Sequence, residues 1–136
     1  MHDTTGIDLS KYRLEKAEAV LKTAKRLLDD EDYASANNRA YYSIFHALRA
    51  VLILDRYDSS KHSGIIAEFR RRYVKEGVFP PEVSKMIGSA FTIRNASDYD
   101  DMFIASKQET ATQIQNAHFV YDSVERYLAS RLNESI

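Results

Sequence analysis

The chain has no cysteine and little glycine or proline. Without cysteine there can be no disulfide, no thiolate zinc site and no cysteine nucleophile. Its absence names no compartment, although it fits a cytoplasmic protein. Four glycines and two prolines among 136 residues leave few helix breakers, while alanine, leucine, arginine, lysine and glutamate are frequent. The composition therefore favours a mostly helical protein.

The sequence also lacks a charge excess and a long apolar run. Its 19 basic and 20 acidic residues give a net charge of −1, so charge alone would not hold it on nucleic acid. The longest apolar-leaning run, residues 47–54, contains Arg49 and is far shorter than a membrane span. The first six residues resemble no signal peptide. We therefore expect a cytoplasmic protein that does not enter a membrane.

The length predicts one domain with a real hydrophobic core. We expect a flexible N-terminus over residues 1–9 and a single helical domain over residues 10–133. Apolar side chains recur at spacings of three and four, which is typical of amphipathic helices. The expected helices run from Ser10 to Leu28, from Asp32 to Leu54, from a serine cap at 59 or 60 to about Gly77, from Pro80-Pro81 to about Arg94, and from Ser106 to about Leu132.

The resulting fold class is all-α, an antiparallel bundle of about five helices. The second helix is the most apolar and should be the central one, with Tyr41, Phe45 and Leu48 in the core. At the start of the fifth helix, Ser106 and Glu109 match a capping box, in which the serine accepts a hydrogen bond from the backbone of the glutamate.

The most charged segment is Arg94-Asn95-Ala96-Ser97-Asp98-Tyr99-Asp100-Asp101. It has no apolar periodicity and is expected to be a loop between two helices. Such a loop needs a partner, which is its own arginine, the next helix N-terminus, a second copy of the chain or a phosphate ligand. It is either a helix junction tied by Arg94 with Asp98 or Asp100, or a binding site.

Two further places combine polar side chains. The second helix carries two overlapping polar sets at helical spacing, which are either satisfied core groups or the edge of a polar pocket. One set is Asn38, Tyr42 and Arg49, and the other is Arg39, Tyr42 or Ser43, and His46. Lys61 and His62 stand where the third helix starts, which is either ordinary capping or an anion site. The histidines have no metal-ligand spacing and no cofactor motif is present, so we expect neither a metal nor a cofactor.

Together these segments resemble a known family. Residues 32–47, the run Lys61-His62-Ser63-Gly64, and the segment from Arg94-Asn95 to Asp98-Tyr99-Asp100 are similar to the marks of small prokaryotic HEPN-domain proteins. The resemblance spans residues 10–132 and implies a helical bundle that often dimerises. Members bind nucleotides or cut RNA, and many act with a minimal nucleotidyltransferase as toxin and antitoxin.

The resemblance also implies a site at Arg94. In the ribonuclease members an arginine is followed, after four to six residues, by a histidine, and two such motifs meet across the dimer. Arg94 and Asn95 match the start of this motif, but Tyr99, Asp100 and Asp101 stand where the histidine belongs. Histidine exchanges protons near neutral pH, whereas tyrosine, with a reference pKa of about 10, and ionised aspartate do not.

Three interpretations follow. The first is a HEPN-domain homodimer that binds a nucleotide or RNA and acts with a nucleotidyltransferase partner. The second is a metal-independent toxin ribonuclease with Arg94, Asp98 and Tyr99 as its catalytic residues. The third is a non-catalytic helical interaction module. The candidate ligand-binding residues are Arg39, Tyr42, His46, Lys61, His62, Arg94, Asn95 and Asp100.

Overall fold

The computed structural model describes residues 4–134. These residues form five α-helices and no strand, which confirms the predicted all-α bundle. The helices are α1 (Thr4–Asp29), α2 (Tyr33–Leu52), α3 (His62–Phe69), α4 (Pro81–Tyr99) and α5 (Lys107–Glu134). A 3-10 turn, Ile53–Asp55, follows α2, and a π turn, Arg70–Val74, continues α3. None of the described helices is both long and apolar enough to cross a membrane.

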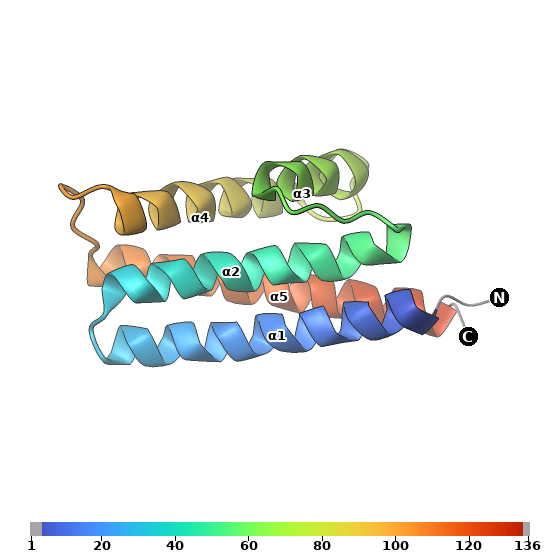
Figure 1. Ribbon diagram of the computed structural model, residues 1–136, viewed down its shortest axis with the longest axis horizontal. Coiled ribbons are helices and arrows are strands. Elements are labelled where there is room, and N and C mark those ends of the chain that lie inside the picture. The colour runs from blue at the N-terminus through green and yellow to red at the C-terminus, as the bar shows by residue number, and fades with distance from the viewer. Residues whose placement is uncertain (1–3, 135–136) are drawn as a thin grey trace.

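Helix α2 is the centre of the bundle. Figure 1 shows α1 on one side of it, α3 and α4 on the opposite side, and α5 behind, and α2 contacts all four of them. Tyr41, Phe45 and Leu48 are 1%, 5% and 0% exposed, so the prediction that they belong to the core is confirmed. A helix covered on several sides cannot keep a single apolar stripe, which is why its apolar residues spread over more than one face.

The first helix begins earlier than the sequence pattern predicts. It starts at Thr4 and not at Ser10, so residues 4–9, expected to precede it, are its first turns. Ser10 is fully buried, and its hydroxyl donates a hydrogen bond to the Ala50 carbonyl oxygen at 2.6 Å. Ser43 of α2 makes the corresponding bond in the opposite direction, because its hydroxyl donates to the Ala17 carbonyl oxygen of α1 at 2.8 Å. Small residues with satisfied hydroxyls allow α1 and α2 to pack closely.

The predicted caps are confirmed at one helix and wrong at another. Ser106 accepts a hydrogen bond from the Glu109 backbone nitrogen at 3.1 Å, as the capping box predicts. Helix α3, in contrast, has Lys61 as its N-cap, with no hydrogen bond from that side chain. Ser59 instead accepts from the Lys61 backbone nitrogen at 3.0 Å, so the serine orders the turn before the helix.

The charged segment after Arg94 is not a loop. Helix α4 continues to Tyr99, and only residues 100–106 connect it to α5. The ion pair between Arg94 and Asp98, one helical turn apart, supports this extension. Side chains of α2 hold the same turn, because the Asn37 amide donates to Ser97 at 3.2 Å and the Asn38 amide donates to Asp98 at 2.8 Å.

We expect Phe45→Ala to lower the free energy of unfolding by about 3–5 kcal/mol, because it removes a buried ring and leaves a cavity. The measurement is urea unfolding followed by circular dichroism. Phe119→Ala is the matched control, since the same change at a ring that is 39% exposed should cost much less. Equal costs for the two variants would contradict the central position of α2.

Candidate functional site

A polar cluster lies between α2 and the last turns of α4, with Arg94 at its centre. Arg94 donates from Nη2 to the Tyr42 hydroxyl and from Nη1 to the Asn95 side-chain oxygen, both at 3.0 Å. Its Nε lies 3.1 Å from an Asp98 carboxylate oxygen, but its N–H is not directed at that oxygen, so this contact is an ion pair. The Arg94 side chain is only 14% exposed.

Three tyrosine rings surround the Arg94 guanidinium. The guanidinium carbon lies 5.4 Å from the Tyr41 ring centre, 5.3 Å from that of Tyr42 and 5.5 Å from that of Tyr99. These distances permit cation–π attraction, which strengthens as water is excluded. The rings and the polar partners together fix the plane of the guanidinium.

A second arginine joins the cluster through α2. Asn38 links Asp98 to Arg39, because the Asn38 side-chain oxygen accepts from the Arg39 Nε at 2.9 Å and from its Nη2. The Arg39 guanidinium lies 5.2 Å from the Tyr42 ring centre. We call Asn38, Arg39, Tyr42, Arg94, Asn95 and Asp98 the Arg94 cluster. It holds two guanidinium groups and one carboxylate, so its own charge is positive.

His62, the first residue of α3, reaches the edge of the Arg94 cluster through Tyr41. Its Nδ1 lies 2.8 Å from the Tyr41 hydroxyl, and its ring centre lies 4.1 Å from that of Phe45. Burial raises the pKa of Tyr41 to about 12, so the phenol keeps its proton at neutral pH. Burial, and the charges of Arg94 and Arg49, lower the pKa of His62 and favour its neutral form.

His46 follows Tyr42 by one helical turn, and their ring centres lie 6.1 Å apart. Its pKa is lowered to about 4, first by burial and then by the charges of Lys16 and three arginines. The imidazole is therefore neutral at physiological pH and adds no charge to the cluster.

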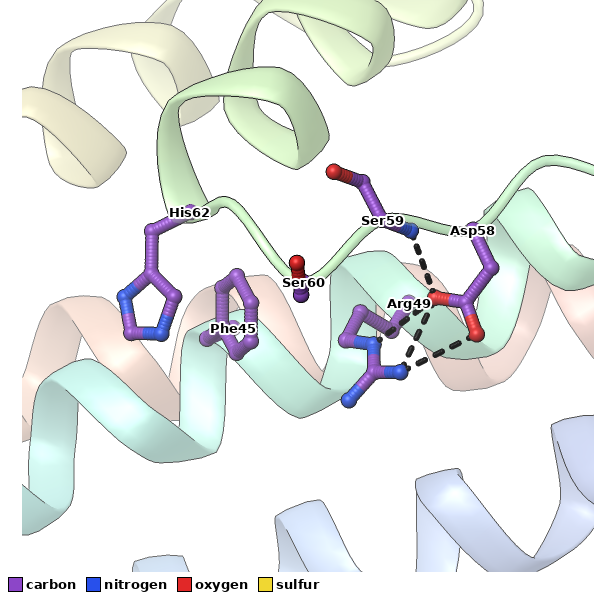
Figure 2. A pocket seen from close by; sticks show the side chains of 6 residues that line it. All are labelled: Phe45, Arg49, Asp58, Ser59, Ser60 and His62. Carbon is purple, nitrogen blue, oxygen red and sulfur yellow. Dashed lines mark hydrogen bonds and ion pairs between the residues drawn. The ribbon is translucent and has the colours of Figure 1, made fainter.

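Arg49 does not belong to the Arg94 cluster. It lines a separate open pocket of about 520 Å³ between α2 and the turn before α3. Figure 2 shows Asp58 directed at Arg49, with His62 beside Phe45 further along the pocket. Asp58 also accepts from Arg13 Nη2 at 2.9 Å. Burial opposes ionisation of Asp58, but the hydrogen bonds from Arg13 and Arg49 lower its pKa overall. Arg49 is thus engaged in an ion pair within the chain.

Most of the site residues expected from the sequence meet in space. Those that gather around Arg94 are Arg39, Tyr42, Asn95, Asp98 and Tyr99, with His62 and His46 at the margin. Lys61 precedes His62, and its side chain is exposed. Asp100 has a local role instead, since its carboxylate accepts from the Met102 backbone nitrogen at 3.0 Å.

Two residues in contact with this group of side chains, Asn38 and Tyr41, were not among the expected ligand-binding residues. Asn38 connects the two arginines through Asp98. Its spacing one helical turn before Tyr42 placed it in the polar set of this helix, but not among the expected ligand-binding residues. Tyr41 was expected only in the core, yet it also contacts both Arg94 and His62. Among residues 4–134, no group of three or more histidine or acidic side chains is arranged to hold a metal ion.

The fold is shared with a solved structure. The protein TT1696 from Thermus thermophilus superposes with a TM-score of 0.72 over 86% of this chain and 96% of its own, at 19% sequence identity. That likeness establishes a small all-α bundle of the same architecture.

The sequence comparisons define the family. The HEPN domain model matches residues 10–127, and the chain belongs to the HEPN domain family. "Putative toxin MJ0142" of Methanocaldococcus jannaschii is 30% identical over 118 residues, covering 87% of this chain and 80% of the relative. A "UPF0332 protein" of Thermotoga maritima is 32% identical over 117 residues, covering 86% of this chain and 89% of the relative.

The His46 environment predicts a loss of stability in acid. The folded-state pKa of about 4 lies below the reference value of 6.5, so the unfolded chain binds more protons between these values. Stability contributed by neutral His46 is therefore present above about pH 6.5 and is lost as the pH falls towards 4. His46→Gln, which cannot titrate, should show a smaller fall in melting temperature over this range than the wild type.

Proton NMR of the His46 ring gives an independent measurement of its pKa. A midpoint near 6.5 in the folded protein, or identical acid dependence of the two melting temperatures, would show that the imidazole is not shielded as described.

Proposed function

We propose that this chain is a toxin-like HEPN protein that binds a nucleotide or RNA at the Arg94 cluster. The observation that carries this proposal is the guanidinium of Arg94, held by Tyr42, Asn95 and Asp98 between two helices. A planar guanidinium in a fixed orientation suits the two oxygens of a phosphate. A positively charged cluster with one carboxylate among two arginines favours an anionic ligand over a cation.

The surroundings of Arg94 also suit the rest of a nucleotide. Tyr99 is 72% exposed, and its ring lies 5.5 Å from the Arg94 guanidinium carbon. An exposed aromatic ring beside a phosphate-binding cation is the usual combination in sites for single-stranded nucleic acid, because bases stack on the ring. On this proposal Arg94 takes the phosphate and Tyr99 takes the base.

The proposed biological setting is a two-component system. Two relatives from Methanocaldococcus jannaschii carry the names "Putative toxin MJ0142" and "Putative toxin MJ0605", which support a toxin-like role. The resemblance to paired HEPN proteins further suggests a homodimer that acts with a minimal nucleotidyltransferase. A nucleotidyltransferase gene adjacent on the genome, and co-purification of its product with this chain, would support that partner. Co-expression without association would count against it.

A second candidate function is RNA cleavage, and the position of His62 favours it. No histidine follows Arg94 in the sequence window where one is expected, but His62 lies across Tyr41 from Arg94 and is held in its neutral form. A neutral imidazole can accept a proton from a ribose hydroxyl. If cleavage occurs, His62→Gln should abolish it while binding is retained, because glutamine keeps a hydrogen-bonding group but cannot exchange a proton near neutral pH.

Arg94→Ala should weaken binding of a short single-stranded RNA at least about tenfold, because a charge-assisted hydrogen bond is worth about 1.5–3 kcal/mol. Arg94→Lys should restore binding only in part, since it keeps the charge and loses the planar fork. Fluorescence anisotropy with labelled RNA, and calorimetry with a nucleoside triphosphate, measure both effects. Arg26→Ala, at an exposed arginine of α1, is the matched control and should bind like the wild type.

Expression in cells separates the two candidate functions. Growth arrest that is lost in Arg94→Ala and in Tyr99→Phe would favour the ribonuclease. Binding that is lost in Arg94→Ala, with no RNA cleavage by the wild type, would favour a binding protein. Unchanged binding and unchanged partner association in Arg94→Ala would refute a ligand site at this cluster.

A further inference from the structure

Helix α2 is mostly buried, but one stripe along it reaches the surface. Arg39, Tyr42, His46 and Arg49 are only partly buried, and their spacings of three, four and three place them on one side of the helix. We call these four residues the α2 stripe. At Arg49 the stripe contacts both α1 and the turn before α3. Figure 1 shows α1 and α3 on opposite sides of α2, so the stripe runs between them.

The α2 stripe connects the Arg94 cluster to the pocket at Arg49. The Arg94 guanidinium carbon lies 5.3 Å from the Tyr42 ring centre, which lies 6.1 Å from that of His46. The Phe45 ring centre lies 6.2 Å from that of His46 and 5.8 Å from the Arg49 guanidinium carbon. Tyr42 and Arg49 are seven residues apart, which is about 10 Å along a helix. No single phosphate group spans that length.

Helix α1 adds two cations beside the stripe. Arg13 donates from Nη1 to the Arg49 carbonyl oxygen at 3.5 Å, and Lys16 follows Arg13 by one helical turn. Because α1 and α2 run antiparallel, Lys16 is level with the turn of α2 that carries His46. Burial first and then the charge of Lys16 lower the pKa of His46, which agrees with this placement.

These cations are only partly neutralised by the protein. Asp58 accepts from Arg13 Nη2 and from Arg49 Nη2, each at 2.9 Å, and so balances one of two charges. Among residues 4–134, neither Lys16 nor Arg39 forms an ion pair. The four cations therefore carry more charge than Asp58 offsets, and a surplus of this kind along one stripe suits an anion with several charges.

The stripe ends at the open pocket of about 520 Å³ whose lining is Phe45, Arg49, Asp58, Ser59, Ser60 and His62. Two nitrogens of Arg49 bond Asp58, while Figure 2 shows the third, Nη1, directed away from that carboxylate. The Phe45 and His62 rings lie 4.1 Å apart in the wall. The volume is that of a small-molecule site. A base from an unpaired strand could enter it, whereas a base within a duplex could not.

We propose that single-stranded nucleic acid, which in the setting proposed above is RNA, lies along the α2 stripe. One phosphate contacts the Arg94 cluster, later phosphates contact Lys16 and Arg49, and an unpaired base occupies the pocket beside His62. Aromatic rings that alternate with cations favour a nucleic acid over an acidic protein, because bases stack on the rings. The inference rests on the ligand site proposed at Arg94 and makes its ligand an oligonucleotide and not a mononucleotide.

Removing one cation of α1 tests the phosphate contacts. Lys16→Ala should weaken binding of single-stranded RNA of about eight nucleotides several-fold at about 0.1 M salt. The slope of log affinity against log salt should become shallower by about 0.7, because one phosphate contact is lost. Fluorescence anisotropy over a salt series measures both. Lys22→Ala is the matched control, since this exposed lysine of α1 pairs with Glu18 and should leave binding unchanged.

Filling the pocket tests the base contact separately. Ser60→Leu adds an apolar side chain to the pocket lining and removes no charge, so it should weaken binding of the same RNA without changing the salt slope. Ser130→Leu, at an exposed serine of α5, is the control. Neither Lys16→Ala nor Ser60→Leu should change the affinity for a nucleoside monophosphate, which occupies the Arg94 cluster alone.

Four results would overturn the inference. The first is equal affinity of the wild type for the RNA and for the monophosphate. The second is unchanged RNA binding in both Lys16→Ala and Ser60→Leu. The third is duplex RNA bound as tightly as the single strand. The fourth is a polyglutamate peptide bound as tightly as RNA, which would assign the stripe to an acidic protein.

The outcomes for the stripe and for the ligand site are separable. RNA and monophosphate binding that are both lost in Arg94→Ala, with normal RNA binding by Lys16→Ala and Ser60→Leu, would leave the proposed function standing and refute the path along α2. RNA binding that is weakened in Lys16→Ala and in Ser60→Leu but normal in Arg94→Ala would establish the path and refute the ligand site at Arg94.

Discussion

The structure depends on burying α2, although this helix carries polar side chains as well as apolar ones. Helix α2 contacts every other helix, so the amides, guanidinium and phenol on one of its sides must find partners inside the protein. The last turns of α4 supply them through Ser97, Asp98 and Arg94. This requirement explains why α4 continues to Tyr99 through a sequence with few apolar residues, and why the functional candidates gather at this contact.

The fold could be predicted from the sequence because its signals are local. Apolar spacing identified the five helices, and Tyr41, Phe45 and Leu48 were correctly placed in the core. The end of α4 could not be predicted in the same way. The bonds that hold its last turn join residues 60 positions apart, from Asn37 to Ser97 and from Asn38 to Asp98, and no local pattern encodes them.

The candidate site shows the same division. The pair Arg94 and Asp98 was open to prediction, because residues four apart on a helix are neighbours. The contact of Arg94 with Tyr42, 52 residues away, was not, and neither was the placement of Arg49 against Asp58 in a separate pocket. Residue types indicated which side chains had functional potential, but the packing of α2 against α4 decided which of them share one site.

The π turn after α3 has a consequence for how this chain can vary. An α-helix rotates by about 100° per residue, so a π turn, which accommodates one extra residue, offsets the helical phase on its two sides. Before it, Phe69 faces the core; within it, Tyr73 bonds Asp55, and Arg131 of α5 bonds both of them. Losing one residue from Arg70–Val74 would regularise the helix but rotate Tyr73 relative to Phe69, and so separate Tyr73 from Asp55 and Arg131. The segment's length is therefore as constrained as its composition. Homologous chains that keep the groove between α3 and α4, which Arg70 lines, should align there without gaps.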